Sequence, residues 1–108
     1  MENNQSSSAT VEAARILGGR IRLARHRRGW TLEELASRVG VTSRTMIKVE
    51  SGNPSVRLGV AFEAAVLTGV PLFDPEPGRR SLEHQITQQQ LALLPARVRP
   101  LPTIDDDF

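Results

Sequence analysis

Hydroxyl-bearing and cationic side chains gather on one short predicted helix in the first half of the chain. Ser43, Arg44 and Lys48 fall on its polar side, and Ile47 lies on the same side. Arginine and lysine donate hydrogen bonds that match the N7 and O6 acceptors of guanine in the major groove, and an aliphatic side chain suits the methyl group of thymine. This set of residues therefore predicts contacts with the base edges of DNA.

The helix that must position these side chains has clear ends. Thr42 supplies the hydroxyl oxygen of an N-cap, and Gly52 stands where a helix stops in the left-handed conformation. Met46 and Val49 lie three residues apart and share the apolar face. We expect this apolar face to pack on the core, so that the polar side points outward.

The preceding segment predicts a second helix. Thr31 and Glu34 have the spacing of a capping box, and an apolar stripe follows, which ends at Val39 before Gly40. Because only Gly40 and Val41 separate this helix from the Thr42 cap, the two helices must meet at a steep angle. Trp30, just before the cap, is expected to be a core residue that packs on Leu35.

Three more helices are predicted. The first covers residues 11–28 with Gly18 and Gly19 weakening its middle, the fourth covers 56–68 after a turn and a cap at residues 53–55, and the fifth covers 82–94 with Ser81 as its cap. The proline-containing stretch 71–78 is expected to be irregular. In the fourth helix the residues predicted to be buried are Leu58, Phe62, Ala65 and Val66.

These elements predict an all-α domain organisation without strands. A chain of 108 residues suits one compact domain with tails. The predicted parts are a disordered arm at residues 1–10, a helix-turn-helix DNA-binding domain at 11–78, an additional helix for core or dimerisation at 79–95, and a tail at 96–108.

Charge is distributed unevenly along the chain. The net charge is +2, but residues 11–60 hold ten Arg or Lys against four Glu, whereas Asp105–Asp107 are acidic. Since residues 13–32 contain no Glu, the arginines there lack local acidic partners, and we expect Arg27 and Arg28 to approach DNA phosphates. The alternative is that the arginines of this helix form an ordinary solvated face.

Several classes of protein are disfavoured. The chain has no cysteine, and His26 and His84 lie far apart, so neither a disulfide framework nor a metal site is expected, and no cofactor is predicted. No nucleophile motif or phosphate-binding glycine loop is present, which argues against an enzyme. No apolar stretch resembles a signal peptide or a membrane span, so we expect a cytoplasmic protein without a membrane partner.

The residues that carry a family resemblance lie in and around the two central helices. They are Thr31, Leu35-Ala36, Gly40-Val41-Thr42, Glu50 and Gly52. At this spacing, the segment from Leu17 to Val70 resembles the Cro/repressor-type (XRE) helix-turn-helix domains. The resemblance implies a lambda-repressor-like five-helix fold and binding to a double-stranded DNA operator as a homodimer.

A second resemblance concerns one branch of that family. The run Gly52-Asn53-Pro54-Ser55-Val56-Arg57-Leu58-Gly59 and the basic, proline-containing tail resemble the HipB-type antitoxins. This implies an autorepressor that also neutralises a HipA-type serine/threonine kinase toxin. The alternatives are a stand-alone XRE-type repressor with no toxin partner and an interaction adaptor that has lost DNA binding.

The resemblance also implies roles for individual residues. Relatives use the first two positions of the third helix and one position a turn later to read bases, which correspond here to Ser43, Arg44 and Lys48. Positions that bind phosphate in the family correspond to Thr31 and Thr45. Leu32 departs from the glutamine that many relatives have after the cap, which leaves the operator chemistry open. The remaining predicted phosphate contacts are Asn53 and Ser55.

The last two segments are expected to bind protein partners. The fifth helix has an apolar side that suits either the core or a second copy of the chain. The tail alternates basic and apolar residues and is either a solubility tail or a segment that docks on the kinase. The residues predicted to contact the kinase are Arg97, Arg99, Ile104, Asp107 and Phe108.

Overall fold

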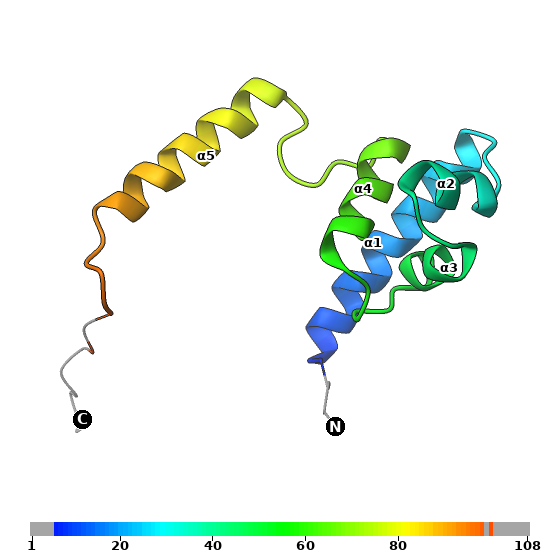
Figure 1. Ribbon diagram of the computed structural model, residues 1–108, viewed down its shortest axis with the longest axis horizontal. Helices are drawn as coiled ribbons and strands as arrows, with labels where there is room; N and C mark the ends of the chain where they lie inside the picture. Colours follow the sequence, from blue (N-terminus) through cyan, green and yellow to red (C-terminus); the bar gives the residue numbers. More distant parts are fainter. Residues whose placement is uncertain (1–5, 99, 101–108) are drawn as a thin grey trace. The chain divides into compact units, whose positions relative to one another are not determined.

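The computed structural model describes residues 6–98 and residue 100, and within them the chain is entirely helical with no strand. The predicted all-α fold class is confirmed (Figure 1). Contacts divide the chain into two units, Met1–Phe73 and Asp74–Phe108. The five helices are α1 (Ser8–Arg27), α2 (Leu32–Val39), α3 (Ser43–Ser51), α4 (Leu58–Thr68) and α5 (Pro77–Ala92).

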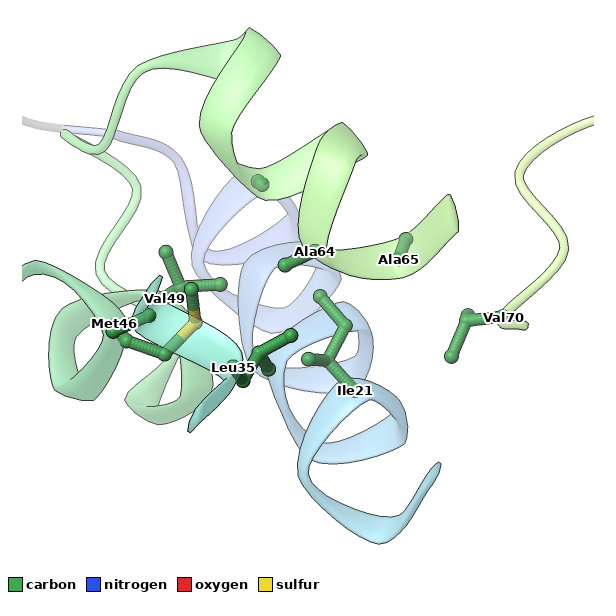
Figure 2. Packing of buried hydrophobic residues seen from close by; sticks show 9 residues of the cluster. Ile21, Leu35, Met46, Val49, Ala64, Ala65 and Val70 are labelled. Atoms are coloured by element: carbon green, nitrogen blue, oxygen red, sulfur yellow. The ribbon is translucent and has the colours of Figure 1, made fainter. Parts of the chain in front are cut away.

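The first unit is a bundle of α1 to α4. Helix α1 packs against α3 and α4, and α2 packs against the same two helices. The cluster of buried apolar side chains lies between these four helices and includes Val70 just beyond α4 (Figure 2). Ile21, Leu35 and Met46 are completely buried. Burial of each of these three side chains contributes about 1.5–3 kcal/mol to folding.

The caps around α2 and α3 match the prediction. The Thr31 hydroxyl accepts from the Glu34 N–H at 3.0 Å, and the Thr31 N–H donates to the Glu34 carboxylate at 2.7 Å, which completes the capping box. Gly40 and Gly52 end their helices with φ values of +90° and +80°. A residue with a side chain would be strained at either glycine.

Helix α1 begins earlier than predicted. The expected start was Val11, but the Ser7 hydroxyl accepts from the Thr10 N–H at 3.1 Å and caps a helix from Ser8. Residues 8–10 therefore belong to α1 rather than to the predicted disordered arm. Residues 1–5 of that arm lie outside the described residues.

Helix α4 also differs from its prediction. It begins at Leu58 rather than Val56, and its N-cap is Arg57, which makes no side-chain capping hydrogen bond. Leu58 and Val66 were expected in the core but are 67% and 61% exposed, whereas Ala61 and Ala64 are buried. The helix is apolar on nearly all sides, so the spacing of its apolar residues does not define which face packs inward.

Helix α5 lies in the second unit. It begins at Pro77 rather than Leu82, because proline fits the first turn of a helix, where its missing N–H costs nothing. Ser81 is therefore inside the helix and is not its cap. No residue of α5 is buried, so this helix adds nothing to the core described above.

Candidate nucleic-acid interface

The exposed face of α3 holds the predicted base-reading residues together. Arg44, Ile47 and Lys48 are exposed and Ser43 is half-buried, while Met46 and Val49 on the other side of the helix are buried. Helix α3 is thus anchored by its apolar side and presents two cations outward. Among the described residues, neither Arg44 nor Lys48 forms an ion pair with a carboxylate. Both side chains can therefore donate to an external acceptor.

The start of α3 orders two hydroxyl groups. The Thr42 hydroxyl group accepts a hydrogen bond from the Thr45 N–H at 3.1 Å. It also donates one to the Thr45 hydroxyl oxygen, at the same distance. Thr45, a predicted phosphate contact, is thereby fixed at the N-terminal end of α3. Its own hydroxyl hydrogen remains available for an acceptor such as a phosphate oxygen.

Other predicted phosphate contacts lie at the ends of the same helices. The capping box holds Thr31 at the start of α2, where the positive end of the helix dipole favours anions. After α3, the Asn53 side-chain oxygen accepts from the Ser55 N–H at 2.8 Å, and the Asn53 N–H donates to the Lys48 carbonyl at 2.9 Å. Asn53 and Ser55 thus form an ordered turn, and Ser55 does not cap α4.

A buried ion pair fixes α3 against α1. The Arg25 guanidinium donates to both carboxylate oxygens of Glu50, from Nε at 2.7 Å and from Nη2 at 3.0 Å. Its Nη1 donates to the Trp30 carbonyl at 2.9 Å. Arg25 is therefore a structural residue, and the alternative that the arginines of this helix form an ordinary solvated face does not hold for it. The hydrogen bonds to Glu50 raise the pKa of Arg25 despite its burial.

A backbone contact also sets the spacing between α1 and α3. A Cβ added at Gly18 would lie 2.4 Å from the Val49 carbonyl oxygen and 2.7 Å from that of Glu50. Gly18 is therefore needed for α3 to lie close to α1. This contact positions the whole base-reading face, and it depends on a residue that sequence reasoning treated only as a weak point of the helix.

Arg27 and Arg28 gather at a different place from the base-reading residues. They line an open hollow of about 510 Å³ together with Arg20 and the C-terminal end of α4. The Arg28 Nε donates to the Thr68 carbonyl at 3.1 Å. The structure thus brings these two arginines to α4 rather than to the exposed face of α3, and their contact with phosphate stays a prediction.

Trp30 lies between two cations. Its ring centroid is 5.2 Å from the Arg28 guanidinium carbon and 4.2 Å from that of Arg38. The side chain is half-buried and packs on the core, close to the structural role expected for it. These cation–π contacts tie the end of α1 to α2.

Besides Arg25, a second cation of α1 lies beside α3, namely Arg22, which the sequence analysis did not single out. Arg22 is exposed and lines a hollow with Ile47 and Ser51 of α3. Its spacing could have indicated this position. Arg22 lies four residues after Gly18 and three before Arg25, so it falls on the same side of α1 as these two residues, which face α3. Without the contacts of Gly18 and Arg25, that spacing had no meaning in the sequence.

The predicted kinase-binding residues are only partly within the described part of the chain. Arg97 lies beyond α5 and is exposed. The other predicted kinase-binding residues lie outside the described residues; they are Arg99, Ile104, Asp107 and Phe108.

In the described part of the chain, no helix is long and apolar enough to cross a membrane. No group of three or more His, Cys, Asp or Glu in that part could hold a metal ion.

Comparison with protein families matches residues 16–74 to a helix-turn-helix domain model, more than half of the chain. This chain belongs to that helix-turn-helix family. The matched segment contains α2 and α3 with the base-reading face, so the protein is an XRE-like helix-turn-helix protein with DNA as its partner and transcription regulation as its role. Helix-turn-helix domains of this type are typically not enzymes. No curated protein and no solved structure matches the chain.

Proposed function

We propose that this helix-turn-helix protein is a sequence-specific autorepressor that binds its operator as a homodimer and acts as the antitoxin of a HipA-type serine/threonine kinase. The observation that supports specific binding is the exposed face of α3. There Arg44 and Lys48 project from a helix whose opposite side is buried, so their positions are fixed before DNA arrives. A rigid helix of this kind suits the major groove.

Arg44 is assigned the main base contact. It lies in the first turn of α3, which is the end that enters the groove in helix-turn-helix proteins. A guanidinium paired with guanine O6 and N7 contributes about 1–3 kcal/mol of discrimination. Ser43, Ile47 and Lys48 complete the base-reading set, and Thr31, Thr45, Asn53 and Ser55 contact the backbone beside it.

Binding measurements with two arginine variants test this assignment. Arg44→Ala should lose affinity for the operator but little for random DNA, which relaxes selection at one base position. Arg28→Ala removes a cation away from α3 and should weaken binding to all sequences alike. Equal losses on operator and random DNA for Arg44→Ala would contradict the base contact.

The homodimer is supported by α5. Leu82 and Ile86 are exposed and four residues apart, so they share one side of α5, which has no buried residue, and the exposed Leu93 follows seven residues later at its C-cap. A second copy would cover this side, and the proposed dimer would use its two α3 helices on half-sites about 34 Å apart. Light scattering should give a dimer mass at micromolar concentration, and a monomer mass would exclude this proposal.

The antitoxin role has a separate basis. It is supported by the resemblance of residues 52–59 and of the C-terminal tail to HipB-type antitoxins. Removal of residues 96–108 should abolish binding to the kinase encoded beside this gene and leave operator binding intact. Unchanged kinase binding would exclude a docking role for the tail. If no kinase gene lies nearby, the base-reading face supports a stand-alone repressor.

A further inference from the structure

A hollow of about 260 Å³ lies beside the exposed face of α3, where α1, α2 and α3 meet. It is lined by Arg22, Arg25, Leu32, Ile47, Glu50 and Ser51. Of the proposed base-reading residues, Ile47 lines this hollow, whereas Arg44 and Lys48 do not. Its chemistry can therefore add to what those two cations select.

Two apolar side chains form part of this hollow. Ile47 is 54% exposed and lies in the row of Ser43 and Ser51, four residues to either side along α3. Leu32, the first residue of α2, is half-buried against the core and fixed by the capping box that begins its helix. One exposed isoleucine is common on a protein surface, but this one shares a hollow with a second, immobilised apolar side chain.

Three of the four polar side chains of the hollow, Arg25, Glu50 and Ser51, are already paired, whereas the exposed Arg22 makes no hydrogen bond or ion pair within the described residues. Both carboxylate oxygens of Glu50 accept from Arg25, and Arg25 also donates to the Trp30 carbonyl. These groups are therefore poor partners for a polar ligand, because a new hydrogen bond would have to replace an existing one. The part of the hollow formed by Leu32 and Ile47 therefore suits a small apolar group.

DNA offers one small apolar group in the major groove, the C5-methyl group of thymine. We propose that Leu32 and Ile47 together form a contact site for the methyl group of one thymine in each operator half-site. This inference rests on the proposed sequence-specific DNA binding. Arg44 and Ile47 are three residues apart, about 4.5 Å along the helix axis, so the thymine lies one or two base pairs from the guanine bound by Arg44.

Removal of single methyl groups from the DNA tests the site. A half-site is first selected by the full-length protein from random duplexes, and each thymine in it is then replaced singly by uracil, which lacks only the methyl group. We expect about a fourfold loss of affinity at one thymine per half-site and no change at the others, since a buried methylene-sized group contributes about 0.8 kcal/mol.

Two variants assign the effect to the proposed residues. Ile47→Ala should bind the thymine and uracil duplexes equally, and so should Leu32→Ala once its thermal unfolding shows a folded protein. Ile16→Ala is the matched control, because Ile16 is 50% exposed on α1 and does not line this hollow. It should keep the fourfold difference.

The outcomes separate this site from the proposed function. A selected half-site in which no uracil replacement changes affinity would overturn the methyl contact and leave specific binding intact. A difference between thymine and uracil that persists in Ile47→Ala and Leu32→Ala would also overturn it. Failure to select any sequence would contradict specific DNA binding itself, and this site with it.

Discussion

Two adjacent glycines of α1 have opposite roles although the sequence presents them as a pair. Gly18 is buried against the carbonyl groups of Val49 and Glu50, whereas a Cβ at Gly19 would meet nothing within 4 Å. The atoms that face Gly18 belong to the backbone, so no side-chain rotation can make room. Gly18 is required by packing, and Gly19 only lowers the helix propensity of its segment.

The two glycine positions should therefore respond differently to alanine. Gly18→Ala should lower the free energy of unfolding by about 1–3 kcal/mol, because α1 and α3 must separate. Gly19→Ala should raise the free energy of unfolding by about 0.5–1 kcal/mol, because an unfolded chain with alanine at this position has less conformational entropy to lose on folding. Urea denaturation measures both, and a stabilised Gly18→Ala protein would disprove the close contact.

The buried pair of Arg25 and Glu50 is the other decisive detail at this scale. Their side chains are only 9% and 6% exposed. Glu50→Gln should cost about 3–5 kcal/mol, because it leaves the Arg25 cation buried without its counter-charge. Glu63→Gln, at an exposed position of α4, is the control and should cost almost nothing. Similar urea midpoints for both variants would contradict a stabilising pair.

The pH dependence of this pair follows from the direction of the shift at Arg25. Folding raises the pKa of Arg25 through its hydrogen bonds to Glu50. A base whose pKa is raised on folding stabilises the protein fully below its unfolded pKa and loses that contribution only above it. The Arg25 contribution should thus be constant from pH 6 to pH 9 in urea denaturation.

At the scale of helices, local capping signals made the helix-turn-helix segment predictable. Thr31 with Glu34, Thr42, Gly40 and Gly52 act through neighbours three or four residues away, so their effect can be seen in the sequence. The start of α5 was missed because Pro77 was taken as a helix breaker, although proline is favoured in a first turn.

Contacts between helices were less predictable. The exposed Leu58 and Val66 were expected in the core because α4 is apolar on most sides and its spacing gives no direction. Arg25 and Glu50 are 25 residues apart, and no local pattern pairs them. The exposed side of α3 was easier to predict, because the positions of Met46 and Val49 alone determine which side of the helix faces outward.

The uncapped start of α4 leads to a prediction for that helix. Arg57 has the extended backbone of an N-cap but no side-chain hydrogen bond to the first turn. Arg57→Ser should raise the free energy of unfolding by about 0.5–1 kcal/mol, because its hydroxyl can accept from a free N–H. Arg57→Ala should give no such gain in thermal unfolding, and equal effects of the two variants would exclude capping as the cause.

At the scale of the whole molecule, the buried core and the proposed dimer contact belong to different parts of the chain. Every residue of the buried apolar cluster falls between Ile21 and Val70, within the first unit. Helix α5 has no buried residue and an exposed apolar side. The first unit therefore provides the folded core and carries the predicted base-reading residues, and the proposed dimer contact falls on α5.

Truncation after Phe73 tests this division. The shortened chain should keep the urea midpoint of the full-length protein at concentrations where both are monomeric, because no core residue is lost. It should also remain monomeric at concentrations at which the full-length chain forms dimers. Analytical ultracentrifugation with urea denaturation measures both properties, and a large fall in the midpoint would show that α5 stabilises the core.

The position of Trp30 provides an optical signal without any label. It is the single tryptophan of the chain, and its indole is half-buried between the Arg28 and Arg38 guanidinium groups at the junction of α1 and α2. Its emission should shift to longer wavelength when this junction opens to water. Fluorescence can thus follow the loosening of the segment that supports the base-reading helix.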